Sequence, residues 1–156
     1  MTVPAVGSRA PDFSARNQYG EPVRLSDYAG RRDVVLVFYP YAFSQVCTSE
    51  LAALRDRPEL LAAAEFLAIS CDPMFTLRAY AEAQDLPFSL LTDFWPHGAI
   101  ASSYGVFDTE RGSALRGTFV VDRDGIIRWS VVNPLPEARS LDDYAEALAK
   151  LHADLR

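Results

Sequence analysis

The segment that most constrains the fold is an apolar run over residues 34–39 that ends at Pro40. Its side chains are apolar without alternation, which favours a central strand covered on both faces of a sheet. Further apolar runs follow at residues 66–70 and 87–91, and segments with helical periodicity separate the three runs. This order predicts strands joined by helices, which is the pattern of an α/β sheet.

Two hairpins and a last helix are expected to complete the sheet. Each hairpin has two short β-rich runs around a glycine-containing turn. The runs are residues 10–17 and 22–25 in the first hairpin, and 117–122 and 126–131 in the second. Ser140 is expected to cap a final helix that reaches about Leu155. We therefore expect one α/β domain over residues 1–156, with a mixed central sheet, helices on both faces and an N-terminal β-hairpin.

Composition and charge argue against several classes of function. The chain has 156 residues, of which 49% are hydrophobic and 23% charged, as in globular proteins with a core. Its net charge of −6 disfavours nucleic acid, which needs a cationic surface. Residues 1–7 lack the basic start and apolar segment of a signal peptide, and no apolar run is long enough to span a bilayer. We therefore expect a cytoplasmic protein with no nucleic-acid or membrane partner.

The cysteine and histidine pattern gives no sign of a metal or cofactor. Cys47 and Cys71 are too few for a disulfide framework, and no Cys-x-x-Cys or His-x-x-x-His spacing occurs. A glycine-rich phosphate loop is also missing. His97 and His152 are expected at the surface as solvated side chains. In a reducing compartment the two thiols are then expected to stay free unless they perform chemistry.

Cys47 is the candidate nucleophile because it lies in the first turn of the helix that follows Pro40. A free thiol has a pKa of about 8.5 and is mostly protonated at neutral pH, so a reactive site must favour the thiolate. A helix start supplies backbone N–H groups and the positive end of the macrodipole. With Ser44 as N-cap, Cys47 is the third helical residue, and the Ser44 hydroxyl can bind the Cys47 N–H or a ligand beside the sulfur. A cation from elsewhere in the chain would complete the site.

The pattern Pro40-x-x-x-Ser44-x-x-Cys47 resembles the Pro-x-x-x-Thr/Ser-x-x-Cys motif of the peroxiredoxin family. Other segments are similar to that family in the same order, at residues 10–13, 69–73, 88–93 and 117–125. The run over residues 93–98 makes the chain most similar to the one-cysteine bacterial subgroup called alkyl hydroperoxide reductase E. This resemblance implies a thioredoxin-like fold and assembly into homodimers or larger homo-oligomers.

The resemblance also implies a thiol peroxidase that reduces hydrogen peroxide and organic hydroperoxides. In this scheme the Cys47 thiolate attacks the peroxide and becomes a sulfenic acid. Ser44 and Arg116 would hold the peroxide oxygens, and Pro40 would shape the loop. Glu50 is expected to hold an arginine in the pocket, and the alternative is that its charge simply favours the first turns of the helix. Ser44 stands where the family usually has Thr, so the hydroxyl is kept and the methyl group is lost.

Aromatic side chains are candidates for an apolar pocket that accepts organic peroxides. They are Tyr39, Tyr41, Phe43 and Trp95. Packing in the core or in a dimer interface is the alternative role for the same residues.

The step that regenerates Cys47 is open between two schemes. Position 52, where the family can carry a second cysteine, is Ala52, and Cys71 lies at the end of a predicted buried strand, where thiols are usually inert. We therefore expect a one-cysteine cycle with an external thiol: thioredoxin, a glutaredoxin-like protein or a low-molecular-weight thiol. The alternatives are a two-cysteine cycle with Cys71 as resolving residue, and a peroxide-sensing or chaperone-like protein that uses Cys47. A thiol–disulfide oxidoreductase is disfavoured because Cys-x-x-Cys is missing.

Overall fold

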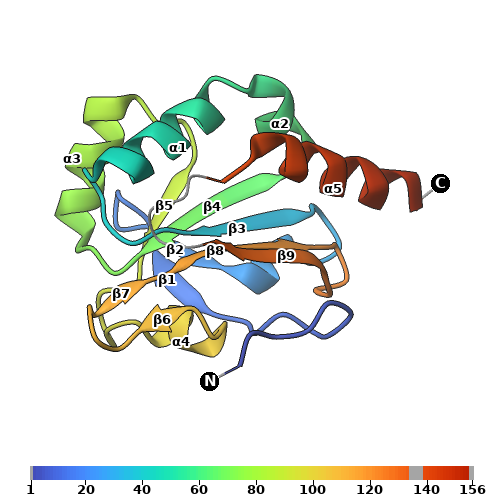
Figure 1. Ribbon diagram of the computed structural model, residues 1–156, viewed down its shortest axis with the longest axis horizontal. Helices are drawn as coiled ribbons and strands as arrows, with labels where there is room; N and C mark the ends of the chain where they lie inside the picture. The colour runs from blue at the N-terminus through green and yellow to red at the C-terminus, as the bar shows by residue number, and fades with distance from the viewer. Residues whose placement is uncertain (1, 134–138, 155–156) are drawn as a thin grey trace.

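A seven-stranded mixed sheet runs through the computed structural model, which describes residues 2–133 and 139–154 (Figure 1). The order of its strands is β2-β1-β5-β4-β3-β8-β9. They are β1 (Ser14–Arg16), β2 (Pro22–Arg24), β3 (Val34–Phe38), β4 (Glu65–Ser70), β5 (Ser89–Thr92), β8 (Arg116–Val121) and β9 (Ile127–Asn133). Strands β3, β4 and β5 are parallel to one another. The antiparallel strands β8 and β9 continue the sheet beside β3, and the antiparallel hairpin β1–β2 continues it beside β5. The mixed sheet and the N-terminal hairpin are as the sequence predicts.

Strand β3 is an interior strand of the sheet, between β4 and β8, and is buried along its whole length. Its side chains alternate between two cores: Val35 and Val37 belong to one, and Leu36 and Phe38 to the other. The ladder with β4 continues to Tyr39, whose N–H donates to Ile69. Proline has no N–H to donate, so the pairing stops at Pro40, and the chain leaves the sheet there.

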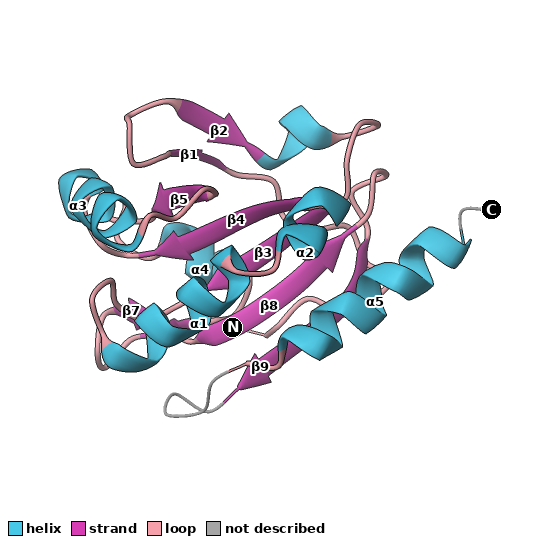
Figure 2. Cartoon of the chain, turned by 90° about the horizontal axis from the view of Figure 1, so that it is seen from above, coloured by secondary structure: helices cyan, strands magenta, loops and turns pink. Residues whose placement is uncertain are grey.

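Helices cover the two faces unequally. The larger core lies under α1 (Gln45–Arg55), α2 (Pro58–Ala63), α3 (Met74–Gln84) and α5 (Leu141–Asp154). The other face carries α4 (Ala99–Ser103) and the 3-10 helix η1 (Leu25–Tyr28). Figure 2 shows α1, α2 and α5 in front of the sheet, seen from above, with α3 beside β5. Helices separate the strands as the sequence predicts, and the predicted helix end at Leu155 lies outside the described residues.

One small hairpin was not predicted from the sequence. Strands β6 (Phe107–Asp108) and β7 (Ser113–Ala114) pair antiparallel between α4 and β8. Two-residue strands are too short to carry a periodic pattern, so the sequence gives little sign of them. The hairpin matters because its turn, residues 109–112, lies next to the site described below.

None of the helices within residues 2–133 and 139–154 is long and apolar enough to cross a membrane.

Gly98, at the start of α4, offers a test of how α4 is fixed to β6. Its φ is +71°, and a Cβ atom there would overlap the ring of Phe107. Gly30 has nearly the same backbone, with φ +73°, but a Cβ atom there would meet nothing within 4 Å. We expect Gly30→Ala to lower the free energy of unfolding by about 1–2 kcal/mol through backbone strain alone. Gly98→Ala should lower the free energy of unfolding by about 1–3 kcal/mol more than Gly30→Ala does, because of overpacking. Urea unfolding measures both variants. Equal losses in the two variants would contradict this packing.

Candidate active site

Cys47 lies in the first turn of α1, at the carboxyl end of β3. Ser44 is the N-cap residue, with extended backbone, and its Oγ accepts a hydrogen bond from the Cys47 N–H at 3.3 Å. The Ser44 carbonyl accepts the first helical bond, from Thr48 N–H at 2.9 Å. Cys47 is therefore the third residue of the helix, as predicted, and its sulfur lies at the positive end of the helix dipole.

The loop between β3 and α1 is tied to the end of β4. Oδ2 of Asp72 accepts hydrogen bonds from the Ala42 N–H at 2.8 Å and from the Ser70 hydroxyl at 2.7 Å. Phe43, just before the cap, has a φ of +68°, a left-handed conformation that is uncommon for a bulky residue. These contacts set the direction in which α1 leaves the sheet.

Helix α3 holds the first turn of α1 from the side. The Tyr80 hydroxyl donates to Thr48 Oγ1 at 3.1 Å, and the ring of Phe43 packs on that of Tyr80 with centroids 4.9 Å apart. Burial raises the pKa of Tyr80 to about 12, so its hydroxyl keeps the proton that it donates at neutral pH. The residues on either side of Ser44 are thus fixed by a neighbouring helix.

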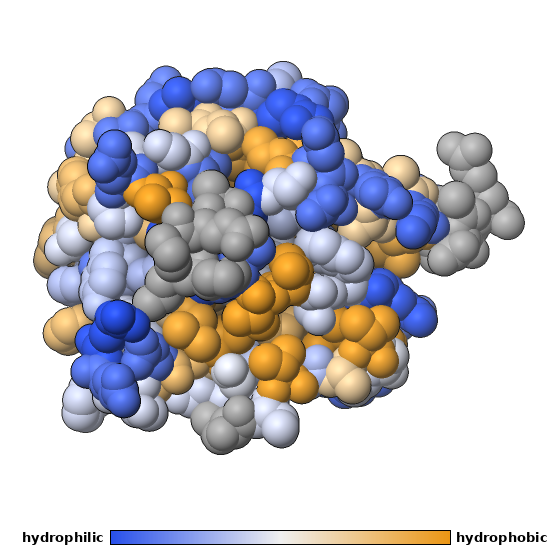
Figure 3. Space-filling view, in the orientation of Figure 1, coloured by the Kyte–Doolittle hydropathy of each residue, from blue (hydrophilic) through white to orange (hydrophobic). Residues whose placement is uncertain are grey.

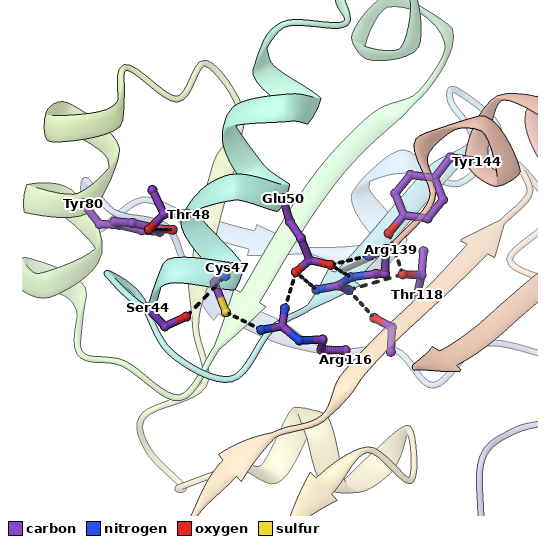
Figure 4. A network of polar contacts seen from close by, with 10 residues as sticks. Ser44, Cys47, Thr48, Glu50, Tyr80, Arg116, Thr118, Arg139 and Tyr144 are labelled. Carbon is purple, nitrogen blue, oxygen red and sulfur yellow. Dashed lines mark hydrogen bonds and ion pairs between the residues drawn. The ribbon is translucent and has the colours of Figure 1, made fainter. Parts of the chain in front are cut away.

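Arg116 supplies the cation beside the sulfur. It is the first residue of β8, the antiparallel neighbour of β3, and its Nη2 donates to Cys47 Sγ at 3.3 Å (Figure 4). Its Nη1 pairs with Glu50, one turn further along α1. Cys47 is fully buried and Arg116 nearly so. The guanidinium of Arg116 therefore places a positive charge in direct contact with the buried sulfur.

Arg139 is a second arginine of the site, and no pattern in the sequence predicts it. Its backbone N–H, Nε and Nη2 donate to the Glu50 carboxylate at 2.7, 3.0 and 3.2 Å. Its Nη1 donates to the Gly117 carbonyl at 3.1 Å and to Thr118 Oγ1 at 3.3 Å. Burial works against the charge of Arg139, but the oxygens of Tyr144 and Glu50 raise its pKa, so it stays cationic. Glu50 had been expected to hold one arginine, and it holds two.

Two arginines and one glutamate form a buried cluster beside the sulfur. Arg116 and Arg139 both pair with the carboxylate of Glu50. Because an unpaired charge in a protein interior is costly, these three side chains stabilise one another.

A hollow of about 340 Å³ lies at the start of α1, and two of the residues that line it, Ser44 and Arg116, contact Cys47. It is lined by Pro40, Tyr41, Ser44, Gln45, Val46, Arg111 and Arg116. Four of the predicted site residues therefore line the same space: Pro40, Tyr41, Ser44 and Arg116. Its volume is within the range of small-molecule sites, about 300–1,000 Å³, so it can hold more than hydrogen peroxide. A peroxide in this hollow would meet Ser44 and Arg116, the two residues that also contact Cys47.

The structure corrects the predicted aromatic pocket, because only Tyr41 lines this hollow. Tyr39 is fully buried, since the period of β3 turns its side chain into the helix-covered core. Phe43 is half-exposed and packs on Tyr80. Trp95 is 84% exposed and lines another hollow with Met74, because it follows β5, which lies two strands away from β3.

Cys71 lies away from Cys47, on the other face of the sheet. Cys47 belongs to the core under α1, whereas the sulfur of Cys71 is close to the backbone of Gly98 and Ala114, on the side of α4. Burial, helped by the nearby charges of Asp93 and Asp72, raises the pKa of Cys71 from 9.0 to about 12. Cys71 is thus a protonated, unreactive thiol at neutral pH.

The two histidines lie outside this site. His97 is exposed in the loop before α4, and His152 is partly exposed on α5, where its Nε2 lies 3.1 Å from Asp33. Within the ranges that the structure describes, no group of three or more His, Cys, Asp or Glu side chains could hold a metal ion.

Comparison with known proteins shows which family the chain is similar to. Residues 6–130 match the AhpC/TSA family. Alkyl hydroperoxide reductase E of Mycobacterium tuberculosis is 47% identical over 152 residues, which cover 95% of this chain and 98% of that protein. The crystal structure of reduced 2-Cys peroxiredoxin from Plasmodium vivax superposes with a TM-score of 0.87 at 28% identity, covering 96% of this chain and 83% of the other. The structure of peroxidoxin BcpB from Mycobacterium tuberculosis gives a TM-score of 0.81 at 33% identity, with 95% and 96% covered.

These matches span the segments that build the site, from the β3–α1 loop with Cys47 to Arg116 on β8. They confirm the resemblance found in the sequence and the thioredoxin-like fold that it implied. The chain belongs to the AhpC/TSA family of peroxiredoxins, and it is therefore a thiol peroxidase.

Proposed function

We propose that this peroxiredoxin reduces hydrogen peroxide and organic hydroperoxides through Cys47, and that an external thiol regenerates it in a one-cysteine cycle. The observation that carries the proposal is the 3.3 Å contact between Arg116 Nη2 and Cys47 Sγ at the start of α1. It places a cation and a helix dipole on one buried sulfur, beside a hollow that a hydroperoxide can enter.

The first half of the cycle is a displacement at oxygen. The Cys47 thiolate attacks the terminal oxygen of the hydroperoxide, so that an S–O bond forms and the O–O bond breaks. The leaving alkoxide or hydroxide takes up a proton and departs as an alcohol or water, and Cys47 becomes a sulfenic acid. Arg116 stabilises the negative charge as it moves to the leaving oxygen. Ser44 Oγ accepts from the Cys47 N–H, which leaves its own hydrogen able to bind a peroxide oxygen.

The second half uses a thiol from outside the chain. That thiol attacks the sulfenic sulfur, giving a mixed disulfide and water, and a second thiol then releases Cys47. Thioredoxin, a glutaredoxin-like protein and a low-molecular-weight thiol are the candidate reductants. The position of Cys71 on the opposite face of the sheet and its raised pKa support this cycle over an internal disulfide.

We further propose that the protein acts in the cytoplasm as a homodimer or larger assembly. A reducing compartment suits a cycle that depends on external thiols. Strand β9 is the last in the sheet order, and its Val132 is 41% exposed. Figure 3, in the orientation of Figure 1, shows hydrophobic residues across the middle of the molecule, in the region of β9. An apolar strand at a sheet edge is a suitable surface for a second copy of the chain.

Replacing each cysteine separately tests the one-cysteine cycle. We expect Cys47→Ser to abolish the reaction with peroxide and Cys71→Ala to keep it, because only Cys47 contacts Arg116. After one equivalent of hydrogen peroxide, mass spectrometry should show one added oxygen atom at Cys47 in both the wild type and Cys71→Ala. A disulfide between Cys47 and Cys71 would contradict the proposed cycle.

Replacing Arg116 tests its electrostatic role. We expect Arg116→Gln to lower the rate constant of Cys47 oxidation by about 10²–10³-fold, as for the loss of one preorganised donor to a developing charge. Arg116→Lys should recover part of that loss because it keeps the positive charge. Arg123→Gln, in the exposed turn after β8, is the control and should react like the wild type. Stopped-flow kinetics measures all four proteins. A rate in Arg116→Gln within twofold of the control, with the fold intact by circular dichroism, would overturn this role.

The raised pKa of Cys71 predicts how stability changes at high pH. The unfolded chain loses the Cys71 proton near pH 9.0, whereas the folded chain keeps it until about pH 12. The contribution of Cys71 to stability is thus fully present below pH 9.0 and is lost as pH rises towards 12, at no more than about 1.4 kcal/mol per pH unit. Urea unfolding between pH 9 and 11 should show this loss in Cys47→Ser but not in Cys47→Ser/Cys71→Ala. Parallel curves would show that Cys71 is ionised in the folded protein.

A further inference from the structure

Arg111 lines the same hollow as Ser44 and Arg116, although it belongs to no motif that the sequence predicts to be functional. It lies in the turn of the β6–β7 hairpin, and its side chain is 58% exposed. The hollow is also lined by Pro40, Tyr41 and Val46, which contribute apolar groups. The hollow thus combines an apolar wall, the catalytic pair Ser44 and Arg116, and a second, solvent-facing guanidinium.

The turn that carries Arg111 is held in place by several hydrogen bonds. Asp108 Oδ1 accepts from the N–H groups of Glu110 and Arg111, at 3.0 and 3.2 Å, and the Asp108 carbonyl accepts from Gly112 at 2.8 Å. The Gly112 carbonyl in turn lies 2.7 Å from His97 Nε2. The backbone at Arg111 is therefore fixed before any substrate arrives.

The guanidinium of Arg111 is paired, but its pairing leaves donors for a ligand. Its Nη1 lies 3.1 Å from Oδ2 of Asp108, whose side chain is only 14% exposed. A guanidinium has five N–H donors in a planar fork that matches the two oxygens of a carboxylate. Among the described residues, Arg111 thus pairs with the carboxylate of Asp108. A substrate carboxylate would compete with Asp108 for the guanidinium or would share the guanidinium with Asp108.

We propose that Arg111 selects organic hydroperoxides that carry a carboxylate, by pairing with that carboxylate while the apolar part of the substrate lies against Pro40, Tyr41 and Val46. The hydroperoxide group then lies towards Ser44 and Arg116, which contact Cys47. This inference rests on the proposed peroxidase function and adds a substrate class and a specificity-determining residue to it. Hydrogen peroxide has neither a carboxylate nor an apolar part, so it gains nothing from Arg111.

A matched pair of substrates isolates the carboxylate. The probes are cumene hydroperoxide and its para-carboxylate derivative, which share the reacting group and the apolar ring. The measured quantity is the ratio of the rate constants for Cys47 oxidation, carboxylate over neutral. We expect Arg111→Gln to lower this ratio by about 10- to 100-fold, the range for loss of a hydrogen bond to a charged group. Arg111→Lys should retain part of the preference, since the charge remains and the planar fork is lost.

Asp108→Asn is expected to change the ratio of the rate constants in the opposite direction. It removes the carboxylate that competes for Arg111, while the amide oxygen can still accept from the N–H groups of the turn. The ratio should therefore rise above that of the wild type. Arg123→Gln, which removes the same charge from the exposed turn at the far end of β8, should leave the ratio unchanged. Raising the ionic strength should weaken the wild-type preference, because the pair is solvent-facing.

Two kinds of failure are distinguishable. If Arg111→Gln and Arg123→Gln give the same ratio, or if Asp108→Asn lowers it, the role of Arg111 is overturned while the peroxidase function stands. If hydrogen peroxide fails to oxidise Cys47 in the wild type, the proposed function itself is overturned.

Discussion

The carboxylate of Glu50 lies between two buried arginines, and the active site depends on this arrangement. Arg116 comes from β8 and Arg139 from the residues before α5, 66 and 89 positions from Glu50 in the chain. Removing one partner of a buried ion pair typically destabilises a protein by about 3–5 kcal/mol, because the other charge is left without compensation. The three side chains therefore stabilise one another only when α1, β8 and the start of α5 are all in place. The site is a property of the complete fold, and none of its segments can form it alone.

Cys47 is joined to this cluster through Arg116, whose Nη2 donates to the sulfur while its Nη1 pairs with Glu50. One guanidinium thus connects the reacting atom to the buried ion pairs. In the proposed reaction the same positive charge stabilises the negative charge that passes to the leaving oxygen. Reactivity at Cys47 and the stability of the β8–α1 contact therefore have one electrostatic cause.

Much of the fold and part of the site could be predicted because their signals are local. The uninterrupted apolar run of β3 marks a central strand, and the spacing of Ser44 and Cys47 marks a capped helix start. Arg116 was found through the family resemblance alone. Arg139 could not be found, because arginine is usually exposed and no pattern in its neighbourhood indicates burial. The aromatic pocket was wrong at Tyr39 and Trp95, because residue type does not tell which side of a strand or which loop a side chain reaches.

The residues that the sequence predicts and those that it does not predict have different roles in the molecule. The groups that contact the sulfur lie on a helix and a strand whose positions the core fixes. Arg111, which we propose selects the substrate, lies on the turn of β6–β7, outside the seven-stranded sheet. Such a turn can change its side chains without disturbing the ion cluster, because its hydrogen bonds are made mainly by the backbone and Asp108. A peroxidase of this fold can therefore keep its chemistry constant while its choice of hydroperoxide varies with one exposed turn.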